Sequence, residues 1–587
     1  MRRFLKKGAA PRAGSNGRPM AGLSLSERLK IRALSAKQTR RRAVTRTLSS
    51  PFLRWRYGGA AADQILIVPQ ELRSADPSFW NEVQESHFGL ACQVADLKGA
   101  SPFRIKPPST AWERELHGFG WLRHLAATEE EAAYDAARDL VIDWIATQRT
   151  PKGIAYEPAV IGRRIISWIA QANMLLEGTD AKTYSQIMAS LTEQVAALNT
   201  TWRNAPDGVP RLVSLIALVL SDLAVSGHDR QLKEAQVQLI AELRRQILND
   251  GGHASRNASV LADLVLDLLP LGQCFQARGY TAPDEYASTV KKALAFLRFM
   301  RMGDGVLARF NGVSAGAPAT LATVLGYSDG ALEAVSQAVD SGYARLERGS
   351  TLIVADVGTP PPVEMAAEAQ SGCLSFEMSD GSRMLFVNGG FPGPADDDWN
   401  AVARATASHN TLCLAESSSS RLVRHDALES LAGGLPIRGP DMALARLSDE
   451  GGAAVLAASH DGYVKRYGLM HNRRISLSSD GRLIEGLDRV EPPNGKLRLK
   501  ADLPFAIHFH VHPDCKVSHS KDRSACTISM RNGAMWSFQA EGAELTIEES
   551  LLFAESTGPR PGMQIVLRGA TFGETEVRWR VFKTSPQ

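Results

Sequence analysis

Residues 468–490 read GLMHNRRISLSSDGRLIEGLDRV. Apolar and polar residues alternate on both sides of a Ser-Asp-Gly turn, which is the pattern of two antiparallel strands with one buried face. Similar stretches bounded by Asp-Gly or Asn-Gly turns follow residue 326: ARLERGSTLIVADVG, CLSFEMSDGSRMLFVNGG, HNTLCLAE, FAIHFHVHPD and MWSFQAEGAELTIEE. Together they predict a large antiparallel β-sandwich.

The chain before this region has a helical period. Between about residues 112 and 302, apolar residues recur at helical spacing, and short linkers such as TPKG, EGTD and NDGG separate the segments. Seven helices are expected, at residues 129–148, 159–176, 181–202, 211–226, 232–248, 258–269 and 285–300. Helices with short linkers pair antiparallel, as in a helical repeat or toroid. Helices followed by strands predict an α+β multidomain protein.

Composition, charge and periodicity divide the chain into three segments. At 587 residues, with 44% hydrophobic and 22% charged residues, the chain has the profile of a globular protein of two or three domains. Residues 1–62 contain 16 Lys and Arg against one acidic residue, whereas the remainder has 51 basic and 62 acidic residues. We expect a basic arm over 1–60, a helical domain over 61–310 and a sandwich over 311–587. The arm either contacts an anionic surface or is a poorly ordered solubilising leader.

Targeting and cysteine signals are weak. The start MRRFLKK resembles a twin-arginine signal, but residues 8–30 lack the apolar core of a signal peptide. No apolar run reaches the roughly 18–20 residues that span a bilayer, so no transmembrane segment is expected. Six cysteines are scattered without a CxxC pair. That spacing argues against a disulfide framework and against a structural zinc site.

Three stretches carry candidate site residues. RATASHNTLCL, residues 404–414, places His409 beside Asn410 where a strand begins. This pair either contacts a ligand or holds the loop that enters the strand. NDGGHASRN, residues 249–257, gathers a His, an Arg and an Asn between two helices, although Asn257 is also a natural helix N-cap. SHDGYVKRYGLMHNRR, residues 459–474, mixes Tyr, His and Arg, which suits an anionic, hydroxyl-rich ligand or an ordinary polar sheet face.

Two further motifs have a chemical and a structural interpretation. GVSAG, residues 312–316, fits a nucleophile elbow around Ser314, but an elbow needs a parallel α/β sheet, and a Gly-rich turn is the alternative. HFHVHP places His508, His510 and His512 on one face of a strand. Two of these imidazoles could share a metal, or all three could lie on the solvent face of the strand.

Several stretches, taken in order, resemble the heparinase II/III-like family of polysaccharide lyases. They are EPAVIGRRIISWI, DGGHASRN, GDGVLARFNG, FVNGGFPG, WNAVARATASHNTL and HDGY followed by GLMHNRR, and the resemblance covers about residues 60–580. It implies an incomplete (α/α) toroid followed by an antiparallel β-sandwich. It also implies β-elimination on uronate-containing glycans, in the periplasm or cell envelope. Because no usable signal peptide is found, a cytoplasmic location stays open.

The sequence departs from the family pattern at three places. The family's Asn-His pair corresponds to Pro210-Arg211, and its following Tyr to the tyrosine-free stretch SRNASV. Its HxHxDA segment corresponds to EAQSGCLSF, residues 368–376, which has no His or Asp. Of the metal ligands that some members build there, only His460 would remain, with Asn388 in place of an Asp. We therefore expect no metal and no cofactor.

The roles needed for elimination are a carboxylate neutraliser, a base and an acid. With the family's groups missing, we expect a rebuilt site in which Arg256 and Asn257 neutralise the carboxylate. His253 or His409 acts as the base and Tyr463 as the acid. Substrate-binding residues are expected at Arg404, Asn410, His460 and Arg473. The partner would be an acidic polysaccharide, and nucleic acid is not expected.

Two other functions stay open at this point. The chain could keep the scaffold as a glycan-binding or envelope-polysaccharide processing protein that no longer eliminates. It could also be a serine hydrolase that uses Ser314 as its nucleophile.

Overall fold

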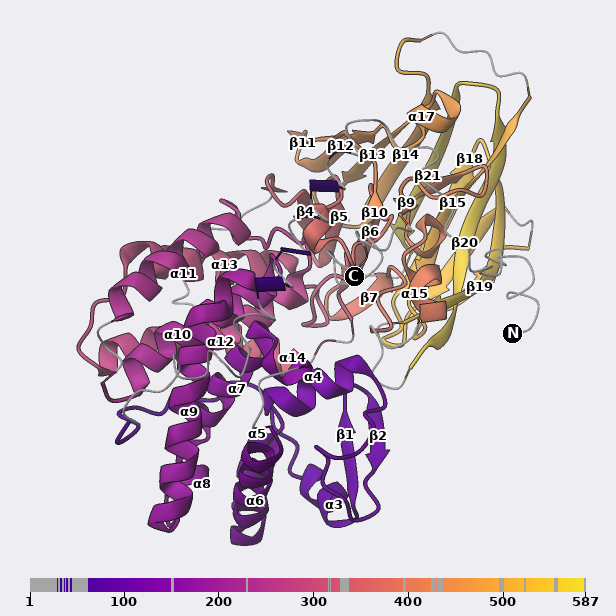
Figure 1. Cartoon of the computed structure of the whole chain (residues 1–587). Helices are drawn as coiled ribbons and strands as arrows, with labels where there is room; N and C mark the ends of the chain where they lie inside the picture. The colour runs from indigo at the N-terminus through magenta and orange to yellow at the C-terminus, as the bar shows by residue number, and fades with distance from the viewer. Residues whose placement is uncertain are drawn as a thin grey trace.

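A computed structural model gives the fold of the chain (Figure 1). It describes residues 62–148, 153–227, 231–314, 318–327, 337–393, 397–423, 437–495, 501–521, 524–553 and 558–584, with isolated residues between these ranges and within 29–44. The basic arm predicted for residues 1–60 lies almost entirely outside the described residues.

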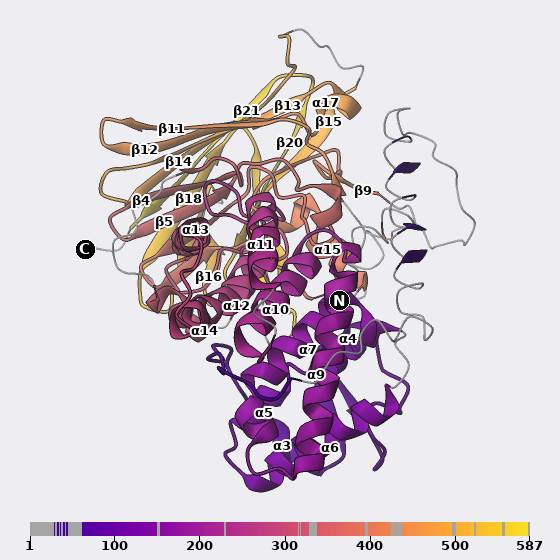
Figure 2. The same cartoon turned by 60° about the vertical axis from the view of Figure 1, so that its left-hand side comes forward.

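The N-terminal part is a group of helices with one small hairpin (Figures 1 and 2). The hairpin pairs β1 with β2. In chain order the elements are α3 (Phe79–Gln84), β1 (His87–Leu90), β2 (Gln93–Asp96), α4 (Thr110–Gly118), α5 (Leu122–Ala126), α6 (Glu131–Thr147), α7 (Pro158–Ala170), α8 (Ala172–Leu176), α9 (Ala181–Thr201), α10 (Val209–Ala224), α11 (Leu232–Gln246), α12 (Ala258–Ala277), α13 (Asp284–Met300) and α14 (Pro318–Gly326).

All seven predicted helices are present, and each begins within two residues of the predicted position. Two differ in extent. The segment 159–176 is divided at Gln171 into α7 and α8. Helix α12 continues past Pro270 to Ala277, where a proline normally ends a helix. Leu271, Cys274 and Phe275 are buried beyond the proline, so packing maintains the helix there.

The C-terminal part contains two large antiparallel sheets and a two-stranded one, in which β9 (Arg421–Leu422) pairs with β10 (Ile437–Arg438). The first has the strand order β11-β12-β13-β14-β21-β18-β17-β16, and the second the order β19-β20-β15-β7-β6-β5-β4-β3 with β8 paired to β15. Their strands are β3 (Gln337–Ala338), β4 (Tyr343–Arg348), β5 (Thr351–Asp356), β6 (Phe376–Asp380), β7 (Arg383–Phe386), β8 (Leu412–Leu414), β11 (Ala443–Glu450), β12 (Ala453–His460), β13 (Met470–Leu477), β14 (Leu483–Glu491), β15 (Leu503–Val511), β16 (Lys516–His519), β17 (Ala525–Ser529), β18 (Met535–Glu541), β19 (Glu544–Leu552), β20 (Arg560–Thr571) and β21 (Thr575–Lys583). The predicted order of helices followed by antiparallel sheets is confirmed.

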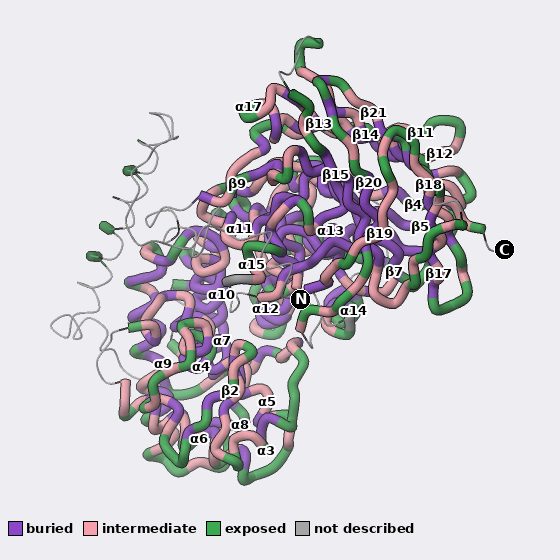
Figure 3. The backbone as a smooth tube through the Cα atoms, turned by 90° about the vertical axis from the view of Figure 1, so that its right-hand side faces the viewer, coloured by how far each residue is buried: buried purple, intermediate pink, exposed green. Residues whose placement is uncertain are grey.

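The nine-stranded sheet is the middle layer of the molecule. One face packs on the eight-stranded sheet through a core that includes Phe376, Phe509 and Trp579. The other face contributes Leu352 and Val354 to the hydrophobic core of the helices. Strand β5 is accordingly buried at all six residues, whereas β13 alternates buried and part-exposed residues (Figure 3). The eight-stranded sheet therefore keeps an open face along β11–β14, and the nine-stranded sheet is part-exposed at its β19–β20 end.

Residues 468–490 form the predicted hairpin. Strands β13 and β14 pair in antiparallel register, with Leu477 opposite Ile484. The turn glycine, Gly481, has a φ of +71°, and a Cβ there would lie 2.1 Å from the carbonyl oxygen of Arg348. Glycine is therefore required both by the backbone conformation and by the close approach of the β4–β5 turn.

Helix α12 is long and apolar enough to cross a membrane by composition alone. In the described residues it is the one helix of this kind, and 61% of its most apolar stretch is buried within the protein. It packs between α10 and α13. That environment is typical of the core helix of a folded domain.

Candidate functional site

The loop between α11 and α12 places His253 under the sandwich. The side chain is 1% exposed, and its Nδ1 and Nε2 lie 2.7 Å from Ser255 Oγ and 3.0 Å from Gln246 Oε1. Burial lowers the pKa of His253 to about 4. The imidazole is therefore neutral near pH 7, and both of its nitrogens are used inside the protein.

Arg256 joins the helical part to the nine-stranded sheet. Its guanidinium donates to the carbonyl oxygens of Ser341 (2.7 Å), Gly342 (2.9 Å) and Thr359 (3.0 Å), and it pairs with Asp356. The group also lies over the Tyr343 ring, 4.8 Å from its centroid. An arginine with this many buried partners acts as a structural clamp between the two parts.

Asn257 fulfils the capping role that the sequence allowed. Its Oδ1 accepts from the backbone N–H of Ser259 (2.9 Å) and Val260 (3.4 Å) at the start of α12. Its Nδ2 donates to Glu368 Oε2 at 2.9 Å. Both ends of the amide therefore have partners, one of them in the sandwich.

The RATASHN segment is also buried. Arg404 Nε donates to the carbonyl oxygen of Ala369 at 2.7 Å, and burial lowers the pKa of Arg404 to about 10. Asn410 Nδ2 donates to the Phe376 carbonyl at 2.8 Å, and Asn410 Oδ1 accepts from the His510 backbone N–H at 2.6 Å. Both side chains brace the loop against the strands around it.

His409 differs from the other predicted residues because one nitrogen is free. Its Nδ1 lies 2.8 Å from the Ala405 carbonyl, whereas Nε2 has no partner among the described residues. The side chain is 0% exposed, and burial lowers the pKa of His409 to about 4. A Cβ at Gly372 would lie 2.7 Å from its Cδ2, so the backbone at Gly372 approaches the ring closely.

The third stretch contributes a buried chain of polar groups to the sandwich core. His471 lies 3.4 Å from His460 and 2.7 Å from Asp488, and Arg473 Nε donates to the same Asp488 oxygen at 2.7 Å. Burial opposes ionisation of Asp488, but Arg473 and His471 hold its pKa below the usual range. The Tyr463 hydroxyl donates to the Leu412 carbonyl at 2.8 Å, and burial raises the pKa of Tyr463 well above its usual value.

These groups form one continuous network, which we call the buried seam. Asp356, the partner of Arg256, exchanges backbone hydrogen bonds with Leu374 and Ser375. Arg473 then donates to the carbonyl oxygens of Leu374 (2.8 Å) and Asn410 (2.5 Å). The seam consists of Arg256, Asp356, Asn410, His460, His471, Arg473 and Asp488, together with His409, which adjoins Asn410 in the chain and contacts the Ala405 carbonyl. All nine predicted site residues lie in the seam or beside it, and all nine are buried.

The helical part contains a second charged cluster. At Arg211, where the family resemblance implies an Asn-His pair, the guanidinium contacts Asp207 (2.5 Å) and Glu242 (3.9 Å). Arg245 contacts the same two carboxylates, and Gln246 donates to Glu242. Sequence reasoning missed Glu242, Arg245 and Gln246. The signal available was their spacing on one face of α11.

Other motifs also find structural roles. His508 and His510 are 7% and 5% exposed, so the predicted solvent face is wrong. Gln564 covers His508, and Ser550 and the Ala407 carbonyl cover His510. Residues 303–314, which lead to Ser314, contain no strand in the described structure, whereas a nucleophile elbow needs one.

The metal site of the family does not fit these residues. His460 accepts from the Gly462 N–H, and Asn388 Oδ1 accepts from the Asn410 N–H. The described residues contain no group of three His, Cys, Asp or Glu that could hold a metal ion.

Comparisons with known proteins agree with this architecture. Residues 331–580 match the family model described as heparinase II/III-like, C-terminal. The chain carries a heparinase II/III-like C-terminal domain. Heparinase III has the same fold, with a TM-score of 0.68 at 12% identity, covering 91% of this chain and 89% of that chain. The heparan sulfate lyase HepC of Pedobacter heparinus, as a mutant, gives 0.60 at 14%, covering 95% and 89%.

One curated relative aligns along most of the chain. FtsZ-localized protein C of Caulobacter vibrioides is 27% identical over 525 residues, which is 88% of this chain and 89% of that protein. The expected family resemblance is therefore confirmed. The TM-scores of 0.68 and 0.60 show that the fold of the two lyases is shared, and at 12% and 14% identity the likeness is to the fold alone.

Proposed function

We propose that this heparinase II/III-like protein binds an acidic polysaccharide without cleaving it by β-elimination. The heparinase II/III-like match over residues 331–580 supports a polysaccharide ligand, and the buried seam is the observation that carries the absence of elimination. The groups expected to serve as base, acid and carboxylate neutraliser are buried, and their polar atoms bond within the protein, apart from His409 Nε2.

Elimination needs these groups at the substrate. A base must come within about 3 Å of the proton that it removes. To do so here, His253 or Tyr463 would have to leave its buried partners, and each polar group left unsatisfied costs about 1–3 kcal/mol. The Arg211 cluster favours the same conclusion, because its guanidinium is already paired with two carboxylates.

A lyase that uses His409 is the second candidate. Its free Nε2 and its pKa of about 4 describe a neutral imidazole with one unused nitrogen. The ring would need an opening next to Gly372 to reach a substrate. This alternative makes His409 the base, as the sequence suggested.

A screen of acidic polysaccharides separates the two candidates. Each polysaccharide is tested for binding by calorimetry and for unsaturated products by ultraviolet absorbance. We expect binding to at least one polysaccharide with no rise in absorbance. A rise that His409→Ala abolishes and His508→Ala retains would overturn the proposal, since both variants remove a buried histidine. Absence of binding to every polysaccharide would also overturn it.

The name of the Caulobacter relative suggests a cellular location for this chain. FtsZ-localized protein C is named for localisation with FtsZ, and the match covers most of both chains. We propose the same localisation for this chain. A fluorescent fusion is expected to follow the distribution of FtsZ and to lose that pattern when FtsZ is depleted. A uniform envelope signal would contradict the proposal.

A further inference from the structure

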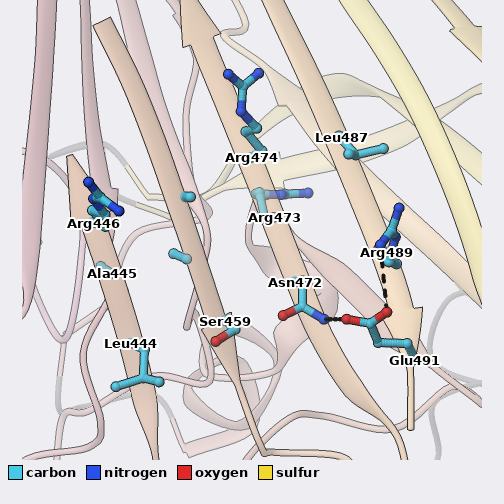
Figure 4. Close-up of a pocket in the computed structure, with 12 residues that line it drawn as sticks. Leu444, Ala445, Arg446, Ser459, Asn472, Arg473, Arg474, Leu487, Arg489 and Glu491 are labelled. Atoms are coloured by element: carbon cyan, nitrogen blue, oxygen red, sulfur yellow. Dashed lines mark hydrogen bonds and ion pairs between the residues drawn. The ribbon is translucent and has the colours of Figure 1, made fainter. Parts of the chain in front are cut away.

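The open face of the eight-stranded sheet contains a hollow of about 420 Å³ across β11–β14 (Figure 4). Its shape follows from the register. Ala457 on β12 lies between Arg446 on β11 and Arg474 on β13, and Ser459 lies between Leu444 and Asn472 in the next row. Short side chains on β12 between long ones on the neighbouring strands leave a trough. We call this surface the arginine groove; its outward side chains are Leu444, Arg446, Ala457, Ser459, Asn472, Arg474, Leu487, Arg489 and Glu491.

Charge is divided unevenly along the groove. At one end, the Glu491 carboxylate is held by Asn472 Nδ2 at 3.0 Å and by Arg489 at 3.7 Å (Figure 4). At the other end, Arg474 pairs with Glu450 at 2.6 Å, and the exposed Arg446 has no acidic partner among the described residues. An anionic group can therefore reach the Arg446 end of the groove without displacing an existing partner of Arg446.

The groove opens on a free sheet edge. Strand β11 is the last strand of its sheet, and in the described chain no backbone hydrogen bond forms on its outer side. Leu444 is 59% exposed on this strand, and Met442 just before it is 38% exposed. Arg348 covers only the far end, where it contacts Asp449 and the Gly452 carbonyl. A long edge strand with exposed apolar side chains is a site for pairing with another extended chain.

We propose that the β11 edge and the arginine groove together dock an extended acidic peptide segment of a protein partner. The peptide backbone pairs with β11. On the face that continues the groove, a carboxylate of the peptide lies beside Arg446, and an apolar side chain two residues away packs on Leu444. A polysaccharide would satisfy the arginines but has no repeating backbone N–H and C=O to complete a sheet edge, so the edge favours a peptide. This surface is separate from the seam, and the inference does not depend on glycan binding.

A synthetic peptide of about ten residues with the repeat Glu-Thr-Val-Thr is the probe, because residues two apart share one face of a strand and Glu and Val then both face the groove. Fluorescence anisotropy with the full chain is the measurement. Charge-assisted hydrogen bonds are the strong ones, so we expect Arg446→Ala to weaken binding about tenfold. Arg580→Ala is the matched control, because Arg580 is exposed on β21 of the same sheet and contacts Gln539. It should change affinity less than about twofold, as expected for a rim charge.

Two further experiments distinguish a peptide ligand from a polysaccharide. A version of the peptide with alternate backbone amides methylated should lose binding, since it cannot pair with β11. Thermal melting of each variant shows that the fold is retained. Equal loss in Arg446→Ala and Arg580→Ala would overturn the proposal, as would undiminished binding of the methylated peptide. Displacement of the peptide by a heparin fragment, with tighter binding of the fragment, would assign the groove to a polysaccharide instead.

Discussion

The buried seam and the arginine groove lie on opposite sides of one strand and use arginine in opposite ways. On β13, Arg473 points into the sandwich core and meets Asp488, whereas its neighbour Arg474 points to the open face and meets Glu450. The side chain of Arg473 is 2% exposed and that of Arg474 is 42% exposed. The inward arginine is thus part of the buried structure, whereas the outward one belongs to a solvent-exposed ion pair on the open face.

The same difference separates the predicted site residues, which lie in or beside the seam, from the residues of the arginine groove. Histidine, arginine and tyrosine drew attention to the seam because these residue types perform catalysis. Their partners in the structure are mostly carbonyl oxygens and carboxylates of the protein itself. The groove has no sequence motif, because its key features are a free sheet edge and the position of Arg446, which has no acidic partner among the described residues.

Removing the carboxylate at the centre of the seam should have the largest effect. Asp488→Ala leaves Arg473 buried without its partner and also removes contacts to His471 and Trp579. Breaking a buried ion pair in this way costs about 3–5 kcal/mol. Chemical denaturation should show this loss, whereas Glu450→Ala, which removes the partner of Arg474 on the open face, should cost less than about 1 kcal/mol. Equal losses would contradict the distinction between the two arginines.

The second-largest effect on stability is expected from acid, which protonates buried histidines in and beside the seam. The pKa of His253 and that of His409 are lowered to about 4 by burial, from an ordinary value near 6.5. The unfolded chain therefore binds protons first as pH falls, and stability is lost between pH 6.5 and about 4, by up to about 3 kcal/mol for each histidine. Stability is measured by thermal melting across that range. His253→Gln should reduce the pH dependence; an unchanged profile would show that His253 does not contribute to it.

A small side chain at Gly372 tests how closely the seam is packed. A Cβ there would lie 2.7 Å from His409 Cδ2 and 3.1 Å from Ser375 Oγ. Gly372→Ala should therefore destabilise the protein by about 1–3 kcal/mol, the usual cost of overpacking. Gly316→Ala is the control, because a Cβ at Gly316 meets nothing within 4 Å among the described residues. A neutral Gly372→Ala would mean that the ring moves readily, which the lyase alternative requires.

The smallest effect on stability is expected at Arg446. Its guanidinium is exposed and has no partner among the described residues. Arg446→Ala should change the free energy of unfolding by no more than about 0.5 kcal/mol, as for other surface substitutions. Denaturant unfolding measures this, and the same variant should still lose peptide binding. A large loss of stability would show that Arg446 supports the fold instead.

Local periodicity was sufficient to predict most of the architecture. The seven helices and the hairpin at residues 468–490 were found because one face of each element is buried at a regular spacing. Strand β5 lies within the predicted stretch ARLERGSTLIVADVG, but all six of its residues are buried, so the alternation expected there does not describe it. The continuation of α12 beyond Pro270 was missed, since tertiary packing overrode a local helix breaker.

The sequence by itself determined the order of helices and strands, the resemblance to heparinase II/III-like proteins and the segments in which polar residues gather. These follow from spacing and residue type, which are local properties. Only the tertiary structure decided that Arg473 faces the core and Arg474 the solvent, and that His253, Arg256 and Asn257 bond within the protein. The physical reason is that the nine-stranded sheet is covered on both faces where it meets the helices, as at β5, while the eight-stranded sheet leaves one face open along β11–β14.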